Sequence, residues 1–381
     1  MRELSNTACI VGVAESDEMG VVPHKSQLAL HLEAITNAVT DAGLKVGDVD
    51  GIFTAGAHSP ALLGEALGIR PRYVDGTSVG GCSFMLLVEH AVAALHHRLC
   101  DVAVISHGES GRSQAGVTRV RDTSISGQYE IPYGFGAPPT YFGLITTRHM
   151  HEYGTTLEQW AQVAVSTRAW ARLNPKAMFR DPLTIEEVLK AKLIAWPFTV
   201  LNICLVTDAG GAVVLTRADR APDCAKKPVY VRGTGEATEH VSVTQMQDLP
   251  LSNATSMSGE RAFAMAGVSH GDFDHIMLYD AFTSGPPIML ESLGFAKPGQ
   301  GVTFFENGKS TPGGSLPINT NGGGLSYTHT GMYGVFPIIE ATRQLRGECG
   351  ERQVPNVKLS LVNGMGGMLS AAATLVLSNQ K

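Results

Sequence analysis

Short runs of apolar and β-branched residues alternate along the chain with longer segments in which apolar residues recur every three or four positions. The short runs predict strands, and the longer segments predict amphipathic helices. Predicted strands cover residues 8–13, 101–107, 211–216, 228–232, 275–279, 357–362 and 372–377. Predicted helices cover residues 26–43, 83–97, 157–173, 184–192, 259–266, 284–293 and 334–346. This alternation favours an α/β fold, and the nearly all-apolar strands are typical of a sheet covered on both faces.

One succession of features occurs twice: a glycine turn, a reactive residue, a helix, a strand and a second glycine turn. The first copy contains Gly80-Gly81, Cys82 and His107-Gly108, and the second contains Gly322–Gly324, His329 and Asn363-Gly364. An internal repeat of this kind changes the expected fold, because two copies of one unit then make the protein. We expect the two halves to be residues 1–225 and 226–381.

Residues 111–200 interrupt the first half. Between residues 111 and 156 the chain is rich in Gly, Ser, Pro and Tyr and has no clear period. Helical segments follow, and Thr184-x-x-Glu187 has the form of a capping box. We interpret the whole stretch as an insertion, which either covers a site or is a plain elaboration of the surface.

Composition and charge narrow the classes of function. The length of 381 residues suits two domains, and 29 Lys+Arg against 35 Asp+Glu leave no basic excess for nucleic acid. No apolar run is long enough to span a membrane, and no signal peptide is visible, so we expect a cytoplasmic protein. The six cysteines are scattered, which argues against a disulfide framework or a zinc site, so no metal is expected. Glycine is in excess, since 43 of 381 residues is about 11% against an average near 7%.

Cys82 is the first candidate for chemistry. It follows two glycines and opens a helix with apolar residues at Phe84, Leu87, Val88, Ala91 and Leu95. A thiol at the N-terminus of a helix is near unpaired N–H groups and the positive end of the dipole, which favour the thiolate. The alternative is a buried and inert cysteine, the commoner fate of a single Cys.

His329 lies in a glycine-rich segment, residues 319–334, directly before a predicted helix. A histidine in such a turn is typical of a proton donor or base that is presented to a ligand. Tyr327 and Tyr333 flank it and are either packing residues or further acid–base groups.

Two more segments end predicted strands. Tyr279 and Asp280 follow one strand, in the position where open α/β sheets place ligand chemistry. The alternative for Asp280 is to cap the next helix, which is the more frequent role of such an Asp. Asn363, Gly364 and Gly366 follow another, where free N–H groups of a glycine turn can form an oxyanion hole or simply a tight connection.

Together these blocks resemble the thiolase superfamily over nearly the whole chain. The motifs that support the resemblance are ACIVGVAES at residues 8–16, Gly-Gly-Cys82-Ser, Tyr279-Asp-Ala-Phe282, residues 319–334 and residues 363–367. The resemblance implies the duplicated five-layered α-β-α-β-α fold of that family with a loop-domain insertion. It also implies a homodimer, acyl-CoA substrates and coenzyme A as co-substrate, with no permanently bound cofactor.

Some positions depart from the family pattern. An ungapped alignment puts Gly81, not Cys82, at the nucleophile, and Asn363 replaces the second cysteine. Tyr279 replaces the Asn that holds an oxyanion-hole water, and Thr330 replaces a proline. The departures resemble a divergent branch of acetyl-CoA acetyltransferase-like and lipid-transfer-like proteins, which includes steroid side-chain aldolases that use tyrosines and the benzoylsuccinyl-CoA thiolase. Members of that branch can pair with a small zinc-ribbon/OB-fold protein.

Three functions follow as hypotheses. The leading one is CoA-dependent thiolysis of a 3-oxoacyl-CoA through an acyl-Cys82 intermediate, with His329 as base and the amides of Gly364 and Gly366 as oxyanion donors. Tyr279 or a water would replace the missing acid/base. The second is retro-aldol cleavage of a 3-hydroxyacyl-CoA by Tyr279 with Tyr327 or His329. The third is a non-catalytic acyl-CoA-binding scaffold, because a fold does not fix a function.

Overall fold

A computed structural model describes residues 2–115, 124–135, 137–241 and 243–381. Its centre is a mixed sheet of nine strands, joined by a separate two-stranded hairpin. The nine strands are β1 (Ala8–Glu15), β2 (Gly51–Thr54), β3 (Tyr73–Asp75), β4 (Val102–Ser110), β7 (Asp208–Arg217), β8 (Val229–Thr238), β9 (His275–Leu278), β10 (Leu359–Gly366) and β11 (Ala371–Ser378). All seven predicted strands are confirmed.

The strand order is symmetric about its middle. It runs β3-β2-β4-β7-β1-β8-β11-β10-β9, so β1 and β8, the first strands of the two expected repeats, are neighbours at the centre. They meet over a short antiparallel stretch in which Cys9 pairs with Tyr230 and Ile10 with Val229. Outward from there, β7 corresponds to β11, β4 to β10 and β2 to β9, with the same strand directions on both sides.

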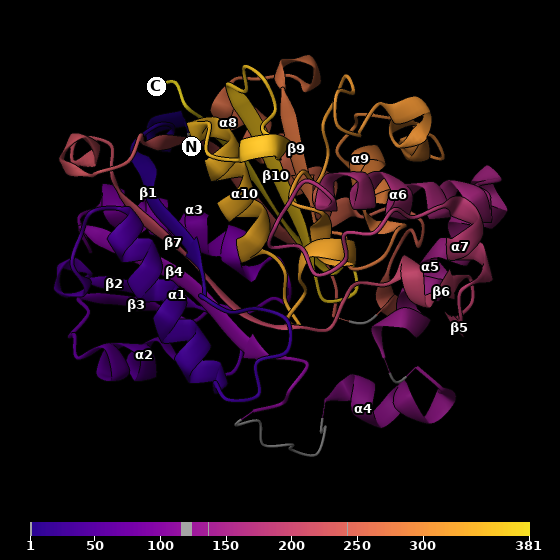
Figure 1. Cartoon of the computed structure of the whole chain (residues 1–381), viewed down its shortest axis with the longest axis horizontal. Helices are drawn as coiled ribbons and strands as arrows, with labels where there is room; N and C mark the ends of the chain where they lie inside the picture. Colours follow the sequence, from indigo (N-terminus) through magenta and orange to yellow (C-terminus); the bar gives the residue numbers. More distant parts are fainter. Residues whose placement is uncertain (1, 116–123, 136, 242) are drawn as a thin grey trace.

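Helices cover both faces of each half of this sheet (Figure 1). They are α1 (Gln27–Asp41), α2 (Pro60–Leu67), α3 (Ser83–His96), α4 (Ile125–Tyr129), α5 (Pro138–Tyr153), α6 (Leu157–Ala171), α7 (Ile185–Lys190), α8 (Asn253–Ala266), α9 (Gly285–Ser292) and α10 (Val335–Arg346). Within the described ranges, no helix is long and apolar enough to cross a membrane.

The helices form outer and central layers. Helix α1 packs on β1, β4 and β7, and α8 packs on β8, β10 and β11. Helices α3 and α10 contact strands of both halves and so lie in the middle, which explains why α3 is buried on nearly all sides. The fold is therefore an α/β fold in which two similar sheet halves share a central helical layer.

Glycine allows the outer helices to approach their strands closely. A Cβ on Gly12 of β1 would lie 2.1 Å from the carbonyl oxygen of Ala38 in α1. A Cβ on Gly233 of β8 would lie 2.2 Å from the carbonyl oxygen of Ala262 in α8. The same close approach of helix and strand thus recurs in both halves.

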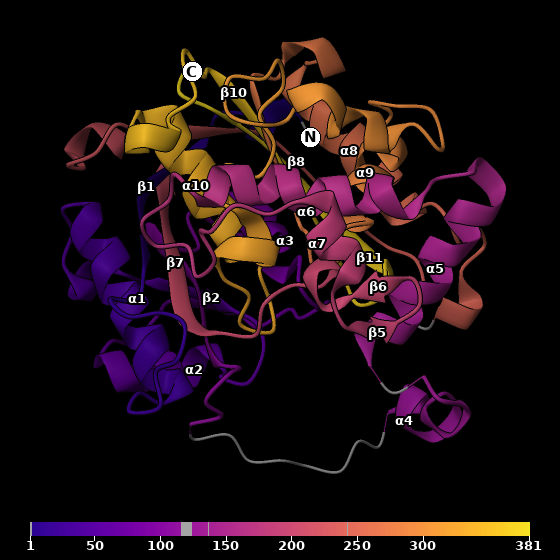
Figure 2. The same ribbon diagram turned by 45° about the vertical axis from the view of Figure 1, so that its right-hand side comes forward.

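The insertion forms a body beside the sheet rather than an unstructured loop. Figure 2 shows α5, α6, α7 and the hairpin of β5 (Leu193–Ala195) and β6 (Phe198–Thr199) gathered on one side of the molecule. The expected capping box is present, since Thr184 Oγ1 accepts the N–H of Glu187 at 3.2 Å and the Glu187 carboxylate accepts the N–H of Thr184 at 2.8 Å. Helix α5 lies within residues 111–156, where the sequence has no clear period.

Helix α5 shows why the pattern failed. Its buried face includes the polar residues Thr146 and His149 beside Tyr141, Phe142 and Ile145. Thr146 and His149 are buried because they bond Ser284 and Glu291 of the second half, at 2.8 and 3.0 Å. A helix whose inward face is partly polar carries a weak hydrophobic period. The short elements β2, β3 and α2 were also missed, because they offer few residues for a period to repeat in.

Candidate functional site

A cavity of about 370 Å³ lies where the two halves and the insertion meet. Its lining is mostly apolar, with few polar side chains. The lining residues are Gly80, Gly81, Pro138, Pro139, Phe142, Ile203, Cys204, Val206, Tyr279, Ala281, Phe282, His329, Gly331, Met332, Met365, Gly367 and Met368. An apolar pocket with a few convergent polar groups is the usual form of a small-molecule site.

The side chains of Tyr279 and His329 both line this cavity and contact each other. The Tyr279 hydroxyl lies 3.1 Å from His329 Nε2, and the main-chain N–H of Tyr333 donates to the Tyr279 oxygen at 2.9 Å. The two side chains lie 50 residues apart in the second half of the chain, one after β9 and one before α10. The structure therefore brings together two of the residues that the sequence singled out.

The hydrogen bonds define which atoms carry protons. The N–H of Gly331 donates to His329 Nδ1 at 3.4 Å, so we assign the proton of the neutral imidazole to Nε2. The Tyr279 oxygen then accepts two N–H groups, from His329 and from Tyr333. The proton of the Tyr279 hydroxyl is left to point to a third partner in the cavity. The same two donors stabilise the oxygen when it is a phenolate.

Burial fixes the charge of both groups at neutral pH. Desolvation lowers the pKa of His329 to about 4, so the imidazole is neutral. Desolvation also raises the pKa of Tyr279 well above its ordinary value, and the N–H of Tyr333 opposes that shift. The resting pair is an uncharged phenol and an uncharged imidazole.

Asp280 holds the segment that carries His329. Its carboxylate accepts the N–H of Gly324 at 2.6 Å and the N–H of Leu325 at 3.5 Å, at the start of the tight turn Gly323–Tyr327. It is completely buried, and desolvation raises its pKa to about 7. Asp280 thus caps a turn from a distance in sequence instead of the helix that follows it.

Cys82 does not line the cavity. Its side chain has no exposure and lies in the main hydrophobic core. Desolvation raises the pKa of the thiol to about 12, the opposite of the activation expected from the start of a helix. Cys82 is therefore a buried, protonated thiol, because desolvation in the core raises its pKa more than the start of the helix lowers it.

Gly81 faces the cavity in its place. A Cβ on Gly81 would lie 2.5 Å from the hydroxyl oxygen and ring carbons of Tyr279. The phenol therefore fills the volume that a side chain at position 81 would occupy. The ungapped alignment that put Gly81 at the family's nucleophile position was the signal that pointed to this replacement.

Asn363, Gly364 and Gly366, which the sequence places after a strand, belong to β10 itself and do not line the cavity. Asn363 is fully buried, and its Nδ2 donates to Thr374 Oγ1 at 2.8 Å. Gly364 and Gly366 belong to β10, and a Cβ on Gly366 would lie 2.9 Å from Cys82 Sγ. These glycines admit the Gly80–Cys82 turn, and it is Gly367 that lines the cavity.

The two flanking tyrosines do not present their hydroxyls to the cavity. The Tyr327 hydroxyl donates to Glu15 at 2.8 Å, and neither residue lines the cavity. Tyr333 donates to Asn321 Oδ1 at 2.9 Å and contributes only its main-chain N–H to the site. Burial raises the pKa of both phenols well above the ordinary value.

Sequence reasoning missed a second apolar cavity of about 560 Å³, which shares Ile203, Cys204 and Val206 with the first. It also missed a small polar cavity behind the loop of Gly331 and Met332, lined by His31, His58, His107 and Glu109. Within the described ranges, no three or more His, Cys, Asp or Glu residues are arranged to hold a metal ion. Histidines scattered over 80 positions leave no local motif, so only the fold reveals them.

Comparisons with known proteins agree with this architecture. A family profile described as "Thiolase C-terminal domain-like" matches residues 235–379. The chain is 33% identical over 363 residues to the 17-hydroxy-3-oxo-4-pregnene-20-carboxyl-CoA lyase of Mycobacterium tuberculosis, covering 90% of this chain and 92% of that protein. It is 29% identical over 379 residues to an acetyl-CoA acetyltransferase of Methanothermobacter thermautotrophicus, covering 97% and 98% of the two chains.

Among solved structures, the Ltp2-ChsH2(DUF35) aldolase matches with a TM-score of 0.91 and 28% identity, over 99% of both chains. The expectation of a thiolase-like fold is confirmed. The chain is an enzyme of the thiolase superfamily, in the branch of SCP2-thiolase-like proteins, steroid side-chain aldolases and acetyl-CoA acetyltransferases.

Proposed function

We propose that this enzyme cleaves a carbon–carbon bond of a 3-hydroxyacyl-CoA by a retro-aldol reaction, with Tyr279 as the acid–base group. The observation that carries the proposal is the Tyr279 hydroxyl, which lies beside Gly81 and accepts N–H groups from both His329 and Tyr333. The names of two relatives, a lyase and an aldolase, support the same class of reaction.

The reaction balances around one proton. The resting phenol of Tyr279 first loses its proton to solvent. The phenolate then takes the proton of the 3-hydroxyl group, and the C2–C3 bond breaks as the C3 carbonyl forms. The electron pair of that bond becomes the enolate of the CoA thioester. Tyr279 then returns the proton to C2, which yields a shortened acyl-CoA and a ketone or aldehyde. No free coenzyme A is consumed, so CoA enters only as part of the substrate.

Fixed N–H donors stabilise the charge at each stage. His329 Nε2–H and the N–H of Tyr333 hold the phenolate, since both already contact the Tyr279 oxygen. We assign the enolate oxygen to the main chain at Gly367, which lines the cavity, in place of Gly364 and Gly366. One such donor typically contributes about 3–4 kcal/mol to the transition state.

The larger cavity supports a bulky, apolar acyl portion in the substrate. Val21, Met178, Phe179, Leu201 and Leu325 contribute to its lining, which is mostly apolar. Because it shares residues with the catalytic cavity, a substrate that reacts at Tyr279 can extend into it. A space of about 560 Å³ accommodates a polycyclic hydrocarbon skeleton.

Thiolysis is the second candidate, which the name of the archaeal relative favours. It needs a nucleophilic thiolate, and Cys82 does not reach the cavity. Cys204 does line the cavity, but desolvation raises its thiol pKa strongly, so the thiol stays protonated at neutral pH. We therefore place retro-aldol cleavage ahead of thiolysis through acyl-Cys82.

A partner protein belongs to the proposal. The similar aldolase of known structure is named for two components, Ltp2 and the DUF35 protein ChsH2. We propose that this chain pairs with a protein of the same class, which would be the small zinc-ribbon/OB-fold partner expected from the resemblance. Copurification of a tagged chain from its native host, followed by mass spectrometry, tests the pairing.

Two incubations separate the candidate reactions. The purified enzyme, with any copurifying partner, is given apolar 3-hydroxyacyl-CoAs without free CoA, and 3-oxoacyl-CoAs with free CoA. We expect a ketone or aldehyde and a shortened acyl-CoA from the first incubation only. Turnover confined to the second would replace the proposal by thiolysis, and turnover in neither would favour the non-catalytic scaffold.

A further inference from the structure

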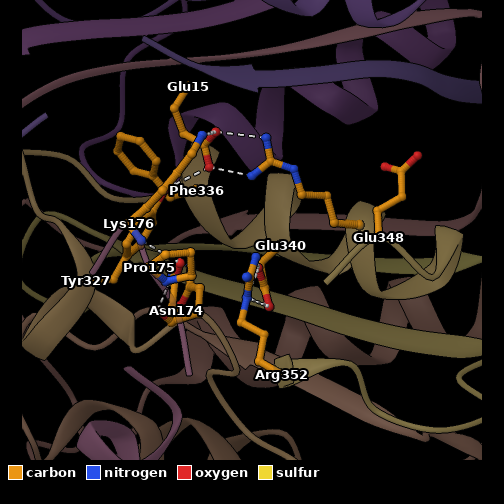
Figure 3. A pocket seen from close by; sticks show the side chains of 11 residues that line it. Glu15, Asn174, Pro175, Lys176, Tyr327, Phe336, Glu340, Glu348 and Arg352 are labelled. Carbon is orange, nitrogen blue, oxygen red and sulfur yellow. Dashed lines mark hydrogen bonds and ion pairs between the residues drawn. The ribbon is translucent and has the colours of Figure 1, made fainter. Parts of the chain in front are cut away.

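A fourth cavity, of about 190 Å³, shares no lining residue with the catalytic one. Figure 3 shows its lining side chains. It is lined by residues from the end of β1, from α10, and from the segments around positions 175, 321 and 350. They are Glu15, Asn174, Pro175, Lys176, Asn321, Tyr327, Phe336, Glu340, Arg343, Glu348 and Arg352. The reaction proposed above uses none of their side chains.

The acceptors of the two buried carboxylates in this cavity are already satisfied. Glu15 Oε1 accepts from Tyr327 and Arg343, and Glu15 Oε2 accepts from Lys176 and Arg343. Arg352 donates to both oxygens of Glu340. Figure 3 shows these two groups of contacts side by side. A carboxylate oxygen with two or more donors has little capacity for another.

Unused donors remain. Asn321 Nδ2 is buried and has no hydrogen-bond partner, in a residue that is only 2% exposed. Lys176 Nζ donates to Glu15 at 2.8 Å, which leaves two of the three ammonium protons free. Asn321 is thus a buried lining side chain with an unpartnered donor, and such a donor fits a ligand that brings an acceptor. A buried donor without a partner is costly, so an occupant that accepts from it is favoured.

The charges of the lining side chains balance, because Lys176, Arg343 and Arg352 are matched by Glu15, Glu340 and Glu348. Lys176 and Arg343 pair with Glu15, Arg352 pairs with Glu340, and Glu348 pairs with Lys226 outside the cavity. An anion here therefore relies on hydrogen bonds from the buried Asn321 and the half-exposed Lys176, not on an excess of positive charge.

We propose that this cavity binds a small monovalent anion, a halide or a short carboxylate, through Asn321 Nδ2 and Lys176 Nζ. Binding there is coupled to the catalytic segment, because Asn321 Oδ1 also accepts from the Tyr333 hydroxyl at 2.9 Å and from the N–H of Gly323 at 2.8 Å. An occupant that fixes Asn321 fixes the residue whose N–H contacts Tyr279. The binding itself does not depend on the reaction proposed above.

Thermal unfolding of the full chain without substrate tests the site. Sodium chloride and sodium formate are titrated in separate arms at constant ionic strength, balanced with sodium HEPES, whose sulfonate is too bulky for the cavity. We expect the melting temperature to rise and saturate in at least one arm. Lys176→Gln should raise the half-saturating concentration about tenfold, the size expected for loss of one charge-assisted hydrogen bond.

Matched variants separate specific binding from general salt effects. Lys176→Arg keeps the charge and should keep the response, and Lys190→Gln removes an exposed lysine elsewhere and should behave as the wild type. Asn321→Asp, nearly isosteric but without the donor, should abolish saturation. A rise that is linear in salt, or equal in Lys176→Gln and Lys190→Gln, would overturn the proposal. Saturation by one anion only would identify the ligand as halide or carboxylate.

Discussion

The Tyr279 phenol occupies the space into which a side chain at Gly81 would project, 2.5 Å from where that Cβ would be. These two residues come from different halves of the chain. The relationship explains why a glycine and a tyrosine occur together here: the phenol needs a neighbour without a side chain. The Tyr279 hydroxyl oxygen therefore lies at the turn before α3, while the thiol of the next residue, Cys82, is buried.

Removal of the Tyr279 hydroxyl should abolish most activity. Tyr279→Phe keeps the ring that packs against Gly81 and loses only the oxygen, so we expect stability to change little and kcat to fall by about 10²–10⁴. Steady-state kinetics on a 3-hydroxyacyl-CoA measures the loss. Tyr230→Phe on β8 is the control and should retain wild-type kcat. Equal activity of both variants would exclude Tyr279 as the acid–base group.

The rate should rise with pH. The cleaving form of Tyr279 is the phenolate, and burial raises its pKa above the ordinary value. The phenolate fraction therefore grows about tenfold per pH unit below that pKa, and log kcat should climb without a plateau between about pH 6 and pH 9. His329, with a pKa of about 4, stays neutral throughout this range. A flat profile would indicate instead that Tyr279 passes its proton to His329.

Cys82→Ala should cost stability but not catalysis. The thiol is fully buried, so the variant leaves a small void and should lose about 1 kcal/mol of unfolding free energy. Cys9→Ala, another fully buried cysteine, serves as the matched control. We expect both variants to keep kcat. An inactive Cys82→Ala beside an active Cys9→Ala would restore the acyl-thiol mechanism.

Gly81→Ala should displace Tyr279. The added methyl group cannot share the space of the phenol, so we expect kcat to drop at least about tenfold and stability to fall by about 1–3 kcal/mol from overpacking. Gly47→Ala is the comparison, since a Cβ there meets nothing within 4 Å. The kinetic loss should persist at temperatures well below the melting point, where both variants are folded. Wild-type kinetics in Gly81→Ala would contradict the close packing.

The sequence predicted the architecture well, because all seven expected strands and the repeated glycine turns depend on local periodicity. It also indicated Tyr279 and His329, which lie at a strand end and in a glycine turn. It misplaced Cys82, since neighbouring residues of a helical turn point about 100° apart and the pattern does not show which one faces inward. Tyr327 bonds Glu15, 312 positions away, and Asn363 bonds Thr374 on the neighbouring strand, and no motif records either contact.

Beside the catalytic cavity, the main chains of the Val79–Gly80 and Gly366–Gly367 segments contact each other directly, without side chains between them. A Cβ on Gly80 would lie 2.4 Å from the nitrogen of Gly367, and one on Gly366 would lie 2.0 Å from the carbonyl oxygen of Val79. The walls, in contrast, are interchangeable hydrocarbon such as Phe142 and Phe282. Substitutions that aim at a new substrate should therefore be made among the apolar wall residues. The glycines should be kept, because a Cβ at either position would clash with main-chain atoms of the other repeat.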